Sequence, residues 1–380
     1  MRVEPPIPAE ALAAIRAPFA AMDAHTLDPP VLQPLGLILD LAGEAMRERL
    51  ILVQADGGAE AALRPDFTIP AARALIESGR AGGRYFYEGK AFRAAPRAGG
   101  GFEEFLQIGL EVFEAAEPPE ADAEIVALAW RASLAGGRQD LTLHLGDVGL
   151  FAAFLAAIGL EEPLAGRIRR AIASPRRLGQ ALERAAGGEE AARLAAGGQL
   201  AELLSGLPEP QAAAVLEDLW ALAGIEPAGG RSAVEIVHRL SERAKAAQTP
   251  ALDPERAALI HRYLAIADAP QKALDAVARL APKPAKGLEA ALTGWERRLA
   301  GLASEGAPEG RMRLATAFGR DFGYYDGLLF EVRSQALGDE QPVAAGGRYD
   351  GLPARLGANL AAGAVGCMIR PGRAWAGGGQ

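Results

Sequence analysis

The segment FRAAPRAGGGFEEFLQIGLEVFE, residues 92–114, joins two apolar, aromatic stretches through a centre rich in Gly. We interpret RYFYEGKAFR (84–93) and EEFLQIGLEVF (103–113) as the two strands of a hairpin, because aromatic and β-branched residues favour strands. The proline and the glycines between them predict a loop. Gln107 and Glu111 are four positions apart, and an even spacing places both on one face of a strand. The segment therefore predicts a sheet that carries polar side chains on one face.

The composition of the whole chain limits the kinds of protein that it can be. The 380 residues allow roughly two or three domains. The single cysteine, Cys367, excludes an internal disulfide and fits a reducing compartment. The four histidines lie far apart, so we expect no metal site, and the net charge of −8 opposes a broad basic face for a phosphate backbone. No apolar run approaches the roughly 20 residues of a membrane helix, and the N-terminus is a poor signal peptide. We expect a cytoplasmic protein with no membrane-bound part.

Three segments of different character follow one another along the chain. Residues 1–160 alternate helical stretches with strand-like runs, residues 161–305 read as successive helices, and strands return over residues 306–380. We expect an α+β fold, an antiparallel sheet with flanking helices, interrupted by an all-helical insertion over 161–305. Inside the insertion, apolar residues at helical spacing predict one packed face of an amphipathic helix. This stripe consists of Val215, Leu216, Leu219 and Leu222.

Carboxylates, an amide, an arginine and tyrosines lie at the predicted strand ends. A carboxylate pairs with an ammonium group, an arginine pairs with a carboxylate, and a tyrosine offers a flat wall with one polar tip. Together they suit a zwitterionic ligand. Each residue alone also fits an ordinary structural role, such as a turn cap for Asp66. The candidate binding residues are Asp66, Thr68, Gln107, Glu111, Arg320, Tyr324, Tyr325 and Tyr349.

The order of these segments resembles the catalytic domain of class II histidyl-tRNA synthetases, over about residues 10–160 and 310–375. LQPLGLILDLAGEAM (32–46) resembles the first, dimer-forming motif of that class. The hairpin segment resembles the second motif, and AVGCMIRPGR (364–373) resembles the third. The resemblance implies a class II synthetase-like fold in which the candidate residues above hold histidine, with Arg320 on its carboxylate side. It also implies a dimer through residues 30–50, where we take the apolar run LGLILDLAG to be exposed.

The departures from that family concern ATP. Ala95 stands where the second motif has a glutamate, and Glu103 follows three glycines where basic residues would hold phosphates. Arg370 replaces a permissive glycine of the third motif, and its bulk should crowd a purine. The resemblance therefore implies no catalytic residue, no cofactor and a degenerate ATP site that retains Arg93, Phe105 and Arg373. Only seven residues follow Arg373, so we expect no anticodon-binding domain and no tRNA ligand.

This combination resembles the regulatory subunits of hetero-oligomeric ATP phosphoribosyltransferase. The resemblance implies a non-catalytic, allosteric subunit that partners the short-form catalytic subunit in the first step of L-histidine biosynthesis, with feedback regulation by L-histidine as ligand. The inhibitory histidine then binds either in the retained pocket or at a subunit interface. The alternative is an adenylate-forming enzyme that activates histidine or a related amino acid. Arg93, Arg320 and Arg373 favour that alternative, and the changed residues of the ATP site oppose it.

Overall fold

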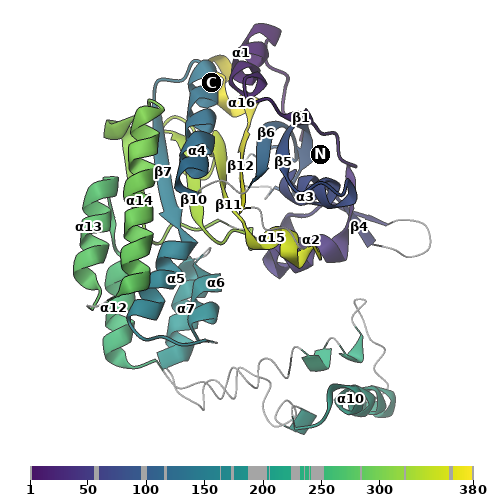
Figure 1. Cartoon of the computed structure of the whole chain (residues 1–380). Coiled ribbons are helices and arrows are strands. Elements are labelled where there is room, and N and C mark those ends of the chain that lie inside the picture. The colour runs from purple at the N-terminus through teal and green to yellow at the C-terminus, as the bar shows by residue number, and fades with distance from the viewer. Residues whose placement is uncertain are drawn as a thin grey trace. The chain divides into compact units, whose positions relative to one another are not determined.

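The computed structural model divides into two compact units, Met1–Ala157 with Tyr263–Gln380 (the first unit) and Ile158–Arg262 (the second unit) (Figure 1). The described residues are 2–54, 60–95, 101–114, 118–162, 164–172, 175–186, 203–204, 206–223, 232–234, 236–238, 240, 252–282, 285–320, 322–358 and 363–378.

Within these residues, nine strands of the first unit form one mixed sheet in the order β1-β5-β6-β12-β11-β10-β7-β9-β8. The pairs β1·β5 and β7·β9 are parallel, and the other neighbours are antiparallel. The mainly antiparallel sheet with flanking helices confirms the α+β class. The strands are β1 (His25–Thr26), β5 (Gly83–Phe92), β6 (Glu104–Glu114), β7 (Leu141–Asp147), β8 (Ala267–Asp268), β9 (Met312–Ala315), β10 (Leu328–Ser334), β11 (Ala344–Arg348) and β12 (Gly363–Ile369).

The predicted hairpin is present as β5 and β6. The two strands are antiparallel, with Gly89 opposite Gln107 and Tyr85 opposite Glu111, so the two polar residues share one face as their spacing predicted. Residues 96–100 of the expected loop lie outside the described residues. On the far side of β6, β12 pairs with it and brings the C-terminal part of the chain against the hairpin.

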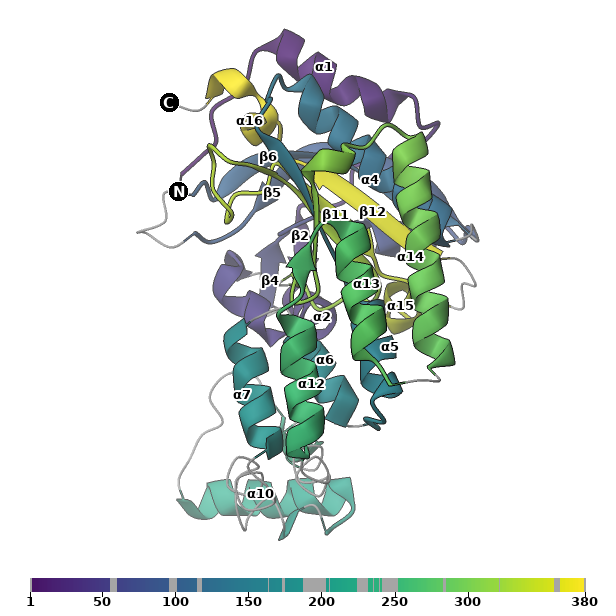
Figure 2. The same cartoon turned by 90° about the vertical axis from the view of Figure 1, so that its left-hand side faces the viewer.

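Helices cover the sheet as amphipathic layers. Helix α4 (Pro118–Ala135) packs across β10, β11 and β12, and α14 (Lys286–Ser304) packs against α4 (Figure 2). The two helices approach closely because Gly301 lacks a side chain, since a Cβ there would lie 2.8 Å from Cβ of Ala123. The other helices of the first unit are α1 (Ala9–Ala20), α2 (Leu35–Ala42), α3 (Thr68–Glu77), α5 (Val148–Ala157), α13 (Pro270–Leu280), α15 (Gly351–Arg355), α16 (Pro371–Ala374) and the 3-10 turns η1 (Glu44–Arg49), η3 (Glu309–Arg311) and η4 (Ala376–Gly378).

The apolar run of α2 lies inside the first unit. Leu35, Ile38 and Leu41 are buried in a cluster with Tyr85 and other core residues. The expectation that this run is exposed is therefore wrong, because its own chain covers it. Exposed apolar side chains lie beside it on a small sheet of order β2-β4-β3, formed by β2 (Leu32–Pro34), β3 (Leu52–Gln54) and β4 (Glu60–Leu63).

The second unit contains α6 (Leu164–Ala171), α7 (Pro175–Ala186), α10 (Glu209–Ala223) and most of α12 (Pro254–Leu264). The stripe predicted on α10 is only partly buried. Leu216 packs with Ala212, Ala213 and Val237, whereas Leu222 is 85% exposed. The other two members, Val215 and Leu219, are also exposed. The buried face of this helix therefore consists of two alanines and Leu216, and not of the predicted stripe.

The chain returns to the first unit at Tyr263, earlier than the boundary expected near residue 305. Helices α13 and α14 belong to the first unit because they pack on β9, on α4 and on α5. Both are amphipathic, like helices of an insertion, so their sequence does not reveal their packing partners. No helix among the described residues is both long and apolar enough to cross a membrane.

Candidate functional site

A pocket lies where α3 begins against the sheet of the first unit. Its walls come from α3, β5, β6, β11 and β12, and from the segment that precedes β10. Small residues of β11 and β12, Ala345, Gly346 and Gly366, form part of its wall. The lining residues are Asp66, Thr68, Tyr87, Arg93, Glu111, Arg320, Phe322, Tyr324, Tyr325, Ala345, Gly346, Gly366, Cys367 and Met368.

Glu111 of β6 is the hydrogen-bonded centre of this pocket. Thr68 Oγ1 donates to its Oε1 at 2.8 Å and Tyr87 donates to the same oxygen at 3.3 Å, while Tyr349 donates to Oε2. Burial raises the pKa of Glu111 to about 8, against the effect of the donors. Gly366 makes room for the carboxylate, because a Cβ there would lie 1.7 Å from Oε2. Glu111 thus joins α3, β5 and the residue after β11.

Asp66, just before α3, offers a carboxylate oxygen to a ligand. Tyr324 donates to its Oδ2 at 2.9 Å, but Oδ1 is buried and has no hydrogen-bond partner among the described residues. Burial raises the pKa of Asp66, and Arg93 and Arg320 oppose that rise. An ammonium group at Oδ1 would satisfy the buried oxygen.

Two guanidinium groups supply the positive side of the pocket. Arg320 bonds to Glu331 at 2.8 Å. Arg93 donates from Nε to the carbonyl oxygen of Pro65 at 2.8 Å, and no carboxylate of the described residues forms an ion pair with it. Burial and the neighbouring Arg49 lower the pKa of Arg93 to about 9. The pocket therefore carries an orphan carboxylate oxygen and an arginine without an ion pair, which together match a zwitterion.

The pocket brings together most of the predicted residues. Of these, Gln107 and Tyr349 do not line it. Tyr349 acts through Glu111, and Gln107 is fully buried with both amide atoms unpartnered among the described residues. The sequence analysis missed Tyr87 and Gly366. Tyr87 lies in a strand of the predicted hairpin, where the alternation of side chains could have shown that it faces the pocket. Nothing in a single sequence distinguishes Gly366 from the other glycines. The other lining residues that the sequence analysis missed are Phe322, Ala345, Gly346, Cys367 and Met368.

Of the residues of the degenerate ATP site, Arg93 lines the pocket itself, whereas Phe105 and Arg373 contact other groups of the protein. Phe105 is 1% exposed and is covered by Arg370, whose Cζ lies 3.8 Å from the ring centroid. Arg93 lies above the same ring at 5.4 Å. Arg373 donates to the carbonyl oxygen of Pro342 at 3.0 Å. Burial and the neighbouring Arg370 lower the pKa of Arg373 to about 9.

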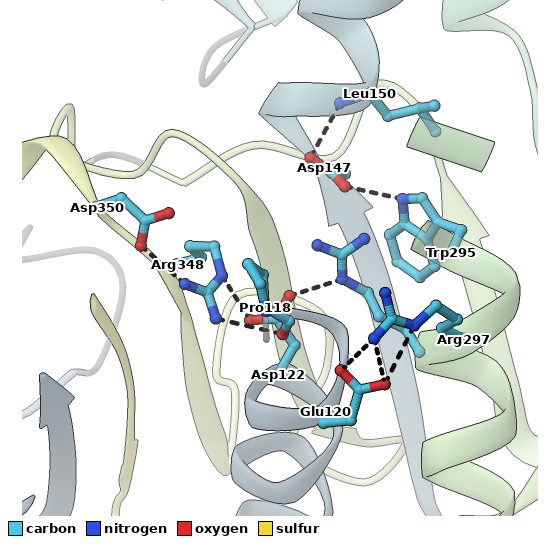
Figure 3. A network of polar contacts seen from close by, with 10 residues as sticks. Pro118, Glu120, Asp122, Asp147, Leu150, Trp295, Arg297, Arg348 and Asp350 are labelled. Atoms are coloured by element: carbon cyan, nitrogen blue, oxygen red, sulfur yellow. Dashed lines mark hydrogen bonds and ion pairs between the residues drawn. The ribbon is translucent and has the colours of Figure 1, made fainter. Parts of the chain in front are cut away.

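A network of ion pairs supports the pocket from the other side of the sheet (Figure 3). Arg348, which precedes Tyr349, bonds through Nε to Asp122 of α4 and through Nη1 to Asp350, both at 2.8 Å. Arg298 of α14 bonds to the other oxygen of Asp122 at 2.6 Å. Asp122 is fully buried, and its two arginines oppose the rise in its pKa that burial causes. The network therefore anchors Tyr349 to the helical layer.

The described part of the chain contains no cluster of three or more His, Cys, Asp or Glu side chains suited to a metal ion. The pocket's donors are instead a carboxylate oxygen, guanidinium groups and phenols, which favour an organic zwitterion over a metal.

Solved structures with the same fold support this architecture. The structure described as an ATP phosphoribosyltransferase regulatory subunit/histidyl-tRNA synthetase from Bacillus halodurans matches with a TM-score of 0.65 at 19% identity, covering 96% of this chain and 77% of that one. The histidyl-tRNA synthetase of Nostoc sp. PCC 7120 matches with a TM-score of 0.60 at 16% identity, covering 96% and 69%. At these identities the likeness shows a class II histidyl-tRNA synthetase-like fold.

Sequence relatives narrow the family. The family model described as histidyl-tRNA synthetase matches residues 25–225 and 211–370. An ATP phosphoribosyltransferase regulatory subunit of Mesorhizobium japonicum is 37% identical over 92% of both chains. The regulatory subunit of Allorhizobium ampelinum is 36% identical over 92% of this chain and 93% of its own. The chain belongs to the family of ATP phosphoribosyltransferase regulatory subunits, which here has a histidyl-tRNA synthetase-like fold.

Proposed function

We propose that this chain is the non-catalytic regulatory subunit of an ATP phosphoribosyltransferase, which carries out the first step of L-histidine biosynthesis. It binds L-histidine in the pocket and passes that signal to the catalytic subunit. Allosteric inhibition then requires histidine to bind one state of the complex more tightly than the other. The proposed histidine-binding residues are Asp66, Thr68, Glu111, Arg320, Tyr324 and Tyr325, which line the pocket, with Tyr349 acting through Glu111.

One observation carries the proposal. The buried Oδ1 of Asp66 has no hydrogen-bond partner among the described residues, and Arg93 and Arg320 line the same pocket. An amino acid brings an ammonium group for the carboxylate and a carboxylate for the guanidinium groups, so one ligand satisfies both sides. The tyrosines that line the pocket offer aromatic walls that suit an imidazole ring.

Loss of aminoacylation follows from the neighbouring site. Ala95 and Glu103 offer no cation to phosphate, and the ring of Phe105 is covered by Arg370. The rival function, adenylate formation, requires ATP to bind there. Histidine-dependent exchange of pyrophosphate into ATP by the purified chain would support the rival, and we expect none above background. Restoring Glu at position 95 and Arg at position 103 should not suffice while Arg370 stays in place.

The proposed partners are the short-form catalytic subunit and a second copy of this chain, without tRNA. We propose the catalytic subunit as a partner because the family is named for a regulatory subunit of ATP phosphoribosyltransferase. Co-purification of tagged catalytic subunit with untagged regulatory chain tests it directly, and separate elution of the two chains would contradict it.

Calorimetry and inhibition curves together test the histidine site. Asp66→Asn removes the charge that faces the ammonium group, and Glu111→Ala removes the centre of the pocket. Loss of the buried charged contact at Asp66 should weaken histidine binding by roughly 2–5 kcal/mol, and loss of the hydrogen-bonded centre at Glu111 should also weaken it. In the complex the same changes should relieve histidine inhibition more than they lower basal activity. Glu305→Gln, on an exposed ion pair with Arg131, is the control and should change neither. Variants that no longer bind histidine but keep the wild-type inhibition curve would place the regulatory site at a subunit interface.

A further inference from the structure

We propose that Glu4 and Arg370 are specificity-determining residues, which close the aromatic face of Phe105 and exclude purine nucleotides from the site beside the pocket. The chain then takes a free amino acid but neither an adenosine nor an aminoacyl-adenylate. This inference deepens the proposed function and rests on it, because selectivity against nucleotides matters only where the neighbouring pocket binds histidine.

The first observation is the position of the Arg370 side chain. Its guanidinium lies over the Phe105 ring with Cζ 3.8 Å from the ring centroid, within the distance of a cation–π contact. Only 5% of the Arg370 side chain is exposed. A purine base binds an aromatic ring by stacking on its face, so it would need the space that the guanidinium occupies.

The second observation is the anchor of that guanidinium. Arg370 Nη2 donates to Glu4 Oε1 at 2.7 Å, and the Glu4 side chain is 6% exposed. Each charge is therefore buried against the other. Moving Arg370 aside would leave the carboxylate of Glu4 buried without its partner, which is unfavourable in a site with little water. The ion pair thus holds Arg370 over the ring.

The third observation is that the N-terminal segment is built into the site. Val3 forms a parallel bridge with Glu104, and the backbone N–H of Glu4 donates to the carbonyl oxygen of Glu104 at 2.9 Å. Gly372 leaves space for Glu4, because a Cβ at that position would lie 2.7 Å from the Glu4 Cδ atom. Residues from both ends of the chain therefore meet beside the ring of Phe105.

The N-terminal segment also holds the acid that replaces the phosphate-binding cation. Glu103 Oε2 accepts a hydrogen bond from the backbone N–H of Arg2 at 2.7 Å. Arg2 reaches across to the carbonyl oxygen of Ala95 at 3.1 Å. One short segment thus anchors the guanidinium that covers the ring and binds both changed residues of the second motif.

Bulk and charge can be separated by two double variants. The emptied variant, Arg370→Gly with Glu4→Ala, leaves open space over Phe105. The filled variant, Arg370→Met with Glu4→Met, removes both charges but keeps the space occupied, because Met is long and unbranched. Each variant removes both partners, so neither leaves a buried charge unpaired. The probe is adenosine, which has no phosphate for Glu103 to repel, titrated by calorimetry together with a thermal unfolding curve for each protein.

We expect no adenosine binding by the wild type or by the filled variant, and at least about tenfold tighter binding by the emptied variant. Three results would overturn the inference. They are adenosine binding by the wild type, no gain of adenosine affinity in the folded emptied variant, and a gain of adenosine affinity in the filled variant equal to that in the emptied one. If the emptied variant does not fold, a second measurement tests the inference. In Phe105→Trp the fifth indole should add emission that neither acrylamide nor adenosine quenches, measured as the difference from the wild type with its four tryptophans. Quenching of that added emission by either compound in a stably folded protein overturns the inference.

Histidine titrations on the same proteins separate the two proposals. The wild type and both double variants should bind histidine with affinities within about threefold of one another. If no protein binds histidine, the proposed function fails, while the adenosine comparison still decides whether Glu4 and Arg370 close the site.

Discussion

Tyr324 donates its phenolic hydrogen to Oδ2 of Asp66 over 2.9 Å, although 258 positions separate the two residues. The other oxygen, Oδ1, is buried without a hydrogen-bond partner among the described residues. Both residues are buried, so the bond orients the carboxylate without competition from water. It joins the segment before β10 to the start of α3.

Tyr324→Phe should weaken histidine binding, because the carboxylate of Asp66 loses its orientation. The unpaired acceptor should also lower the free energy of unfolding by roughly 1–3 kcal/mol. Urea unfolding and calorimetry measure the two effects. The matched control is Tyr85→Phe, since the Tyr85 hydroxyl is buried without a hydrogen-bond partner in the described structure and its loss should be neutral or stabilising. Equal losses of histidine affinity and of unfolding free energy in both variants would show that the bond to Asp66 contributes neither to binding nor to stability.

Glu111 should make the stability of the fold depend on pH. Its pKa is about 8 in the folded chain against an ordinary 4.5, so the folded state holds a proton that the unfolded state releases between these values. The stabilisation is full below about pH 4.5 and is lost as pH rises through about 8. We expect the free energy of unfolding to fall between pH 6 and pH 8.5, and Glu111→Gln to remove most of that fall. Urea unfolding at both pH values checks this, and an unchanged slope in the variant would contradict it.

Self-association should depend on the small sheet beside α2. The side chain of Leu32 is 50% exposed, whereas the neighbouring Ile38 is in the core. We propose that the chain dimerises there, so Leu32→Glu should raise the dissociation constant of the dimer at least tenfold without lowering thermal stability. Light scattering over a dilution series measures it. Leu203→Glu, in the exposed part of the second unit, is the control. A wild type that shows only a 39.5 kDa monomer would contradict the dimer itself.

Two acids on α4 should differ sharply in what they contribute. Asp122 is fully buried between Arg348 and Arg298, and Asp122→Ala leaves Arg298 without this carboxylate and Arg348 with Asp350 alone (Figure 3). We expect a loss of roughly 3–5 kcal/mol in the free energy of unfolding. Glu120 pairs with Arg297 at the surface, and Glu120→Ala should cost at most about 1 kcal/mol. Urea unfolding of the two variants compares them, and similar losses would mean that burial does not set the strength of these pairs.

The sequence determined what local pattern and residue type can determine. The strand-favouring residues of 84–93 and 103–113, with the Pro- and Gly-rich stretch between them, indicated the hairpin. The even spacing of Gln107 and Glu111 indicated their common face, because side chains alternate along any strand. The ordered segments around Asp66 and Tyr324 also located most of the pocket. These features depend on residues that are close together in the chain, or on short motifs that can be recognised in a single sequence.

Only the tertiary structure decided which faces are buried and which distant residues meet. The same helical periodicity describes α10, whose large residues are mostly exposed, and α14, whose partner is α4 of the first unit. The ion pair of Glu4 with Arg370 joins residues 366 positions apart, and Gly366 matters because the carboxylate of Glu111 lies against it. The physical reason is that burial, ion pairing and close packing are properties of contacts in space, and a single sequence encodes those contacts only through the whole fold.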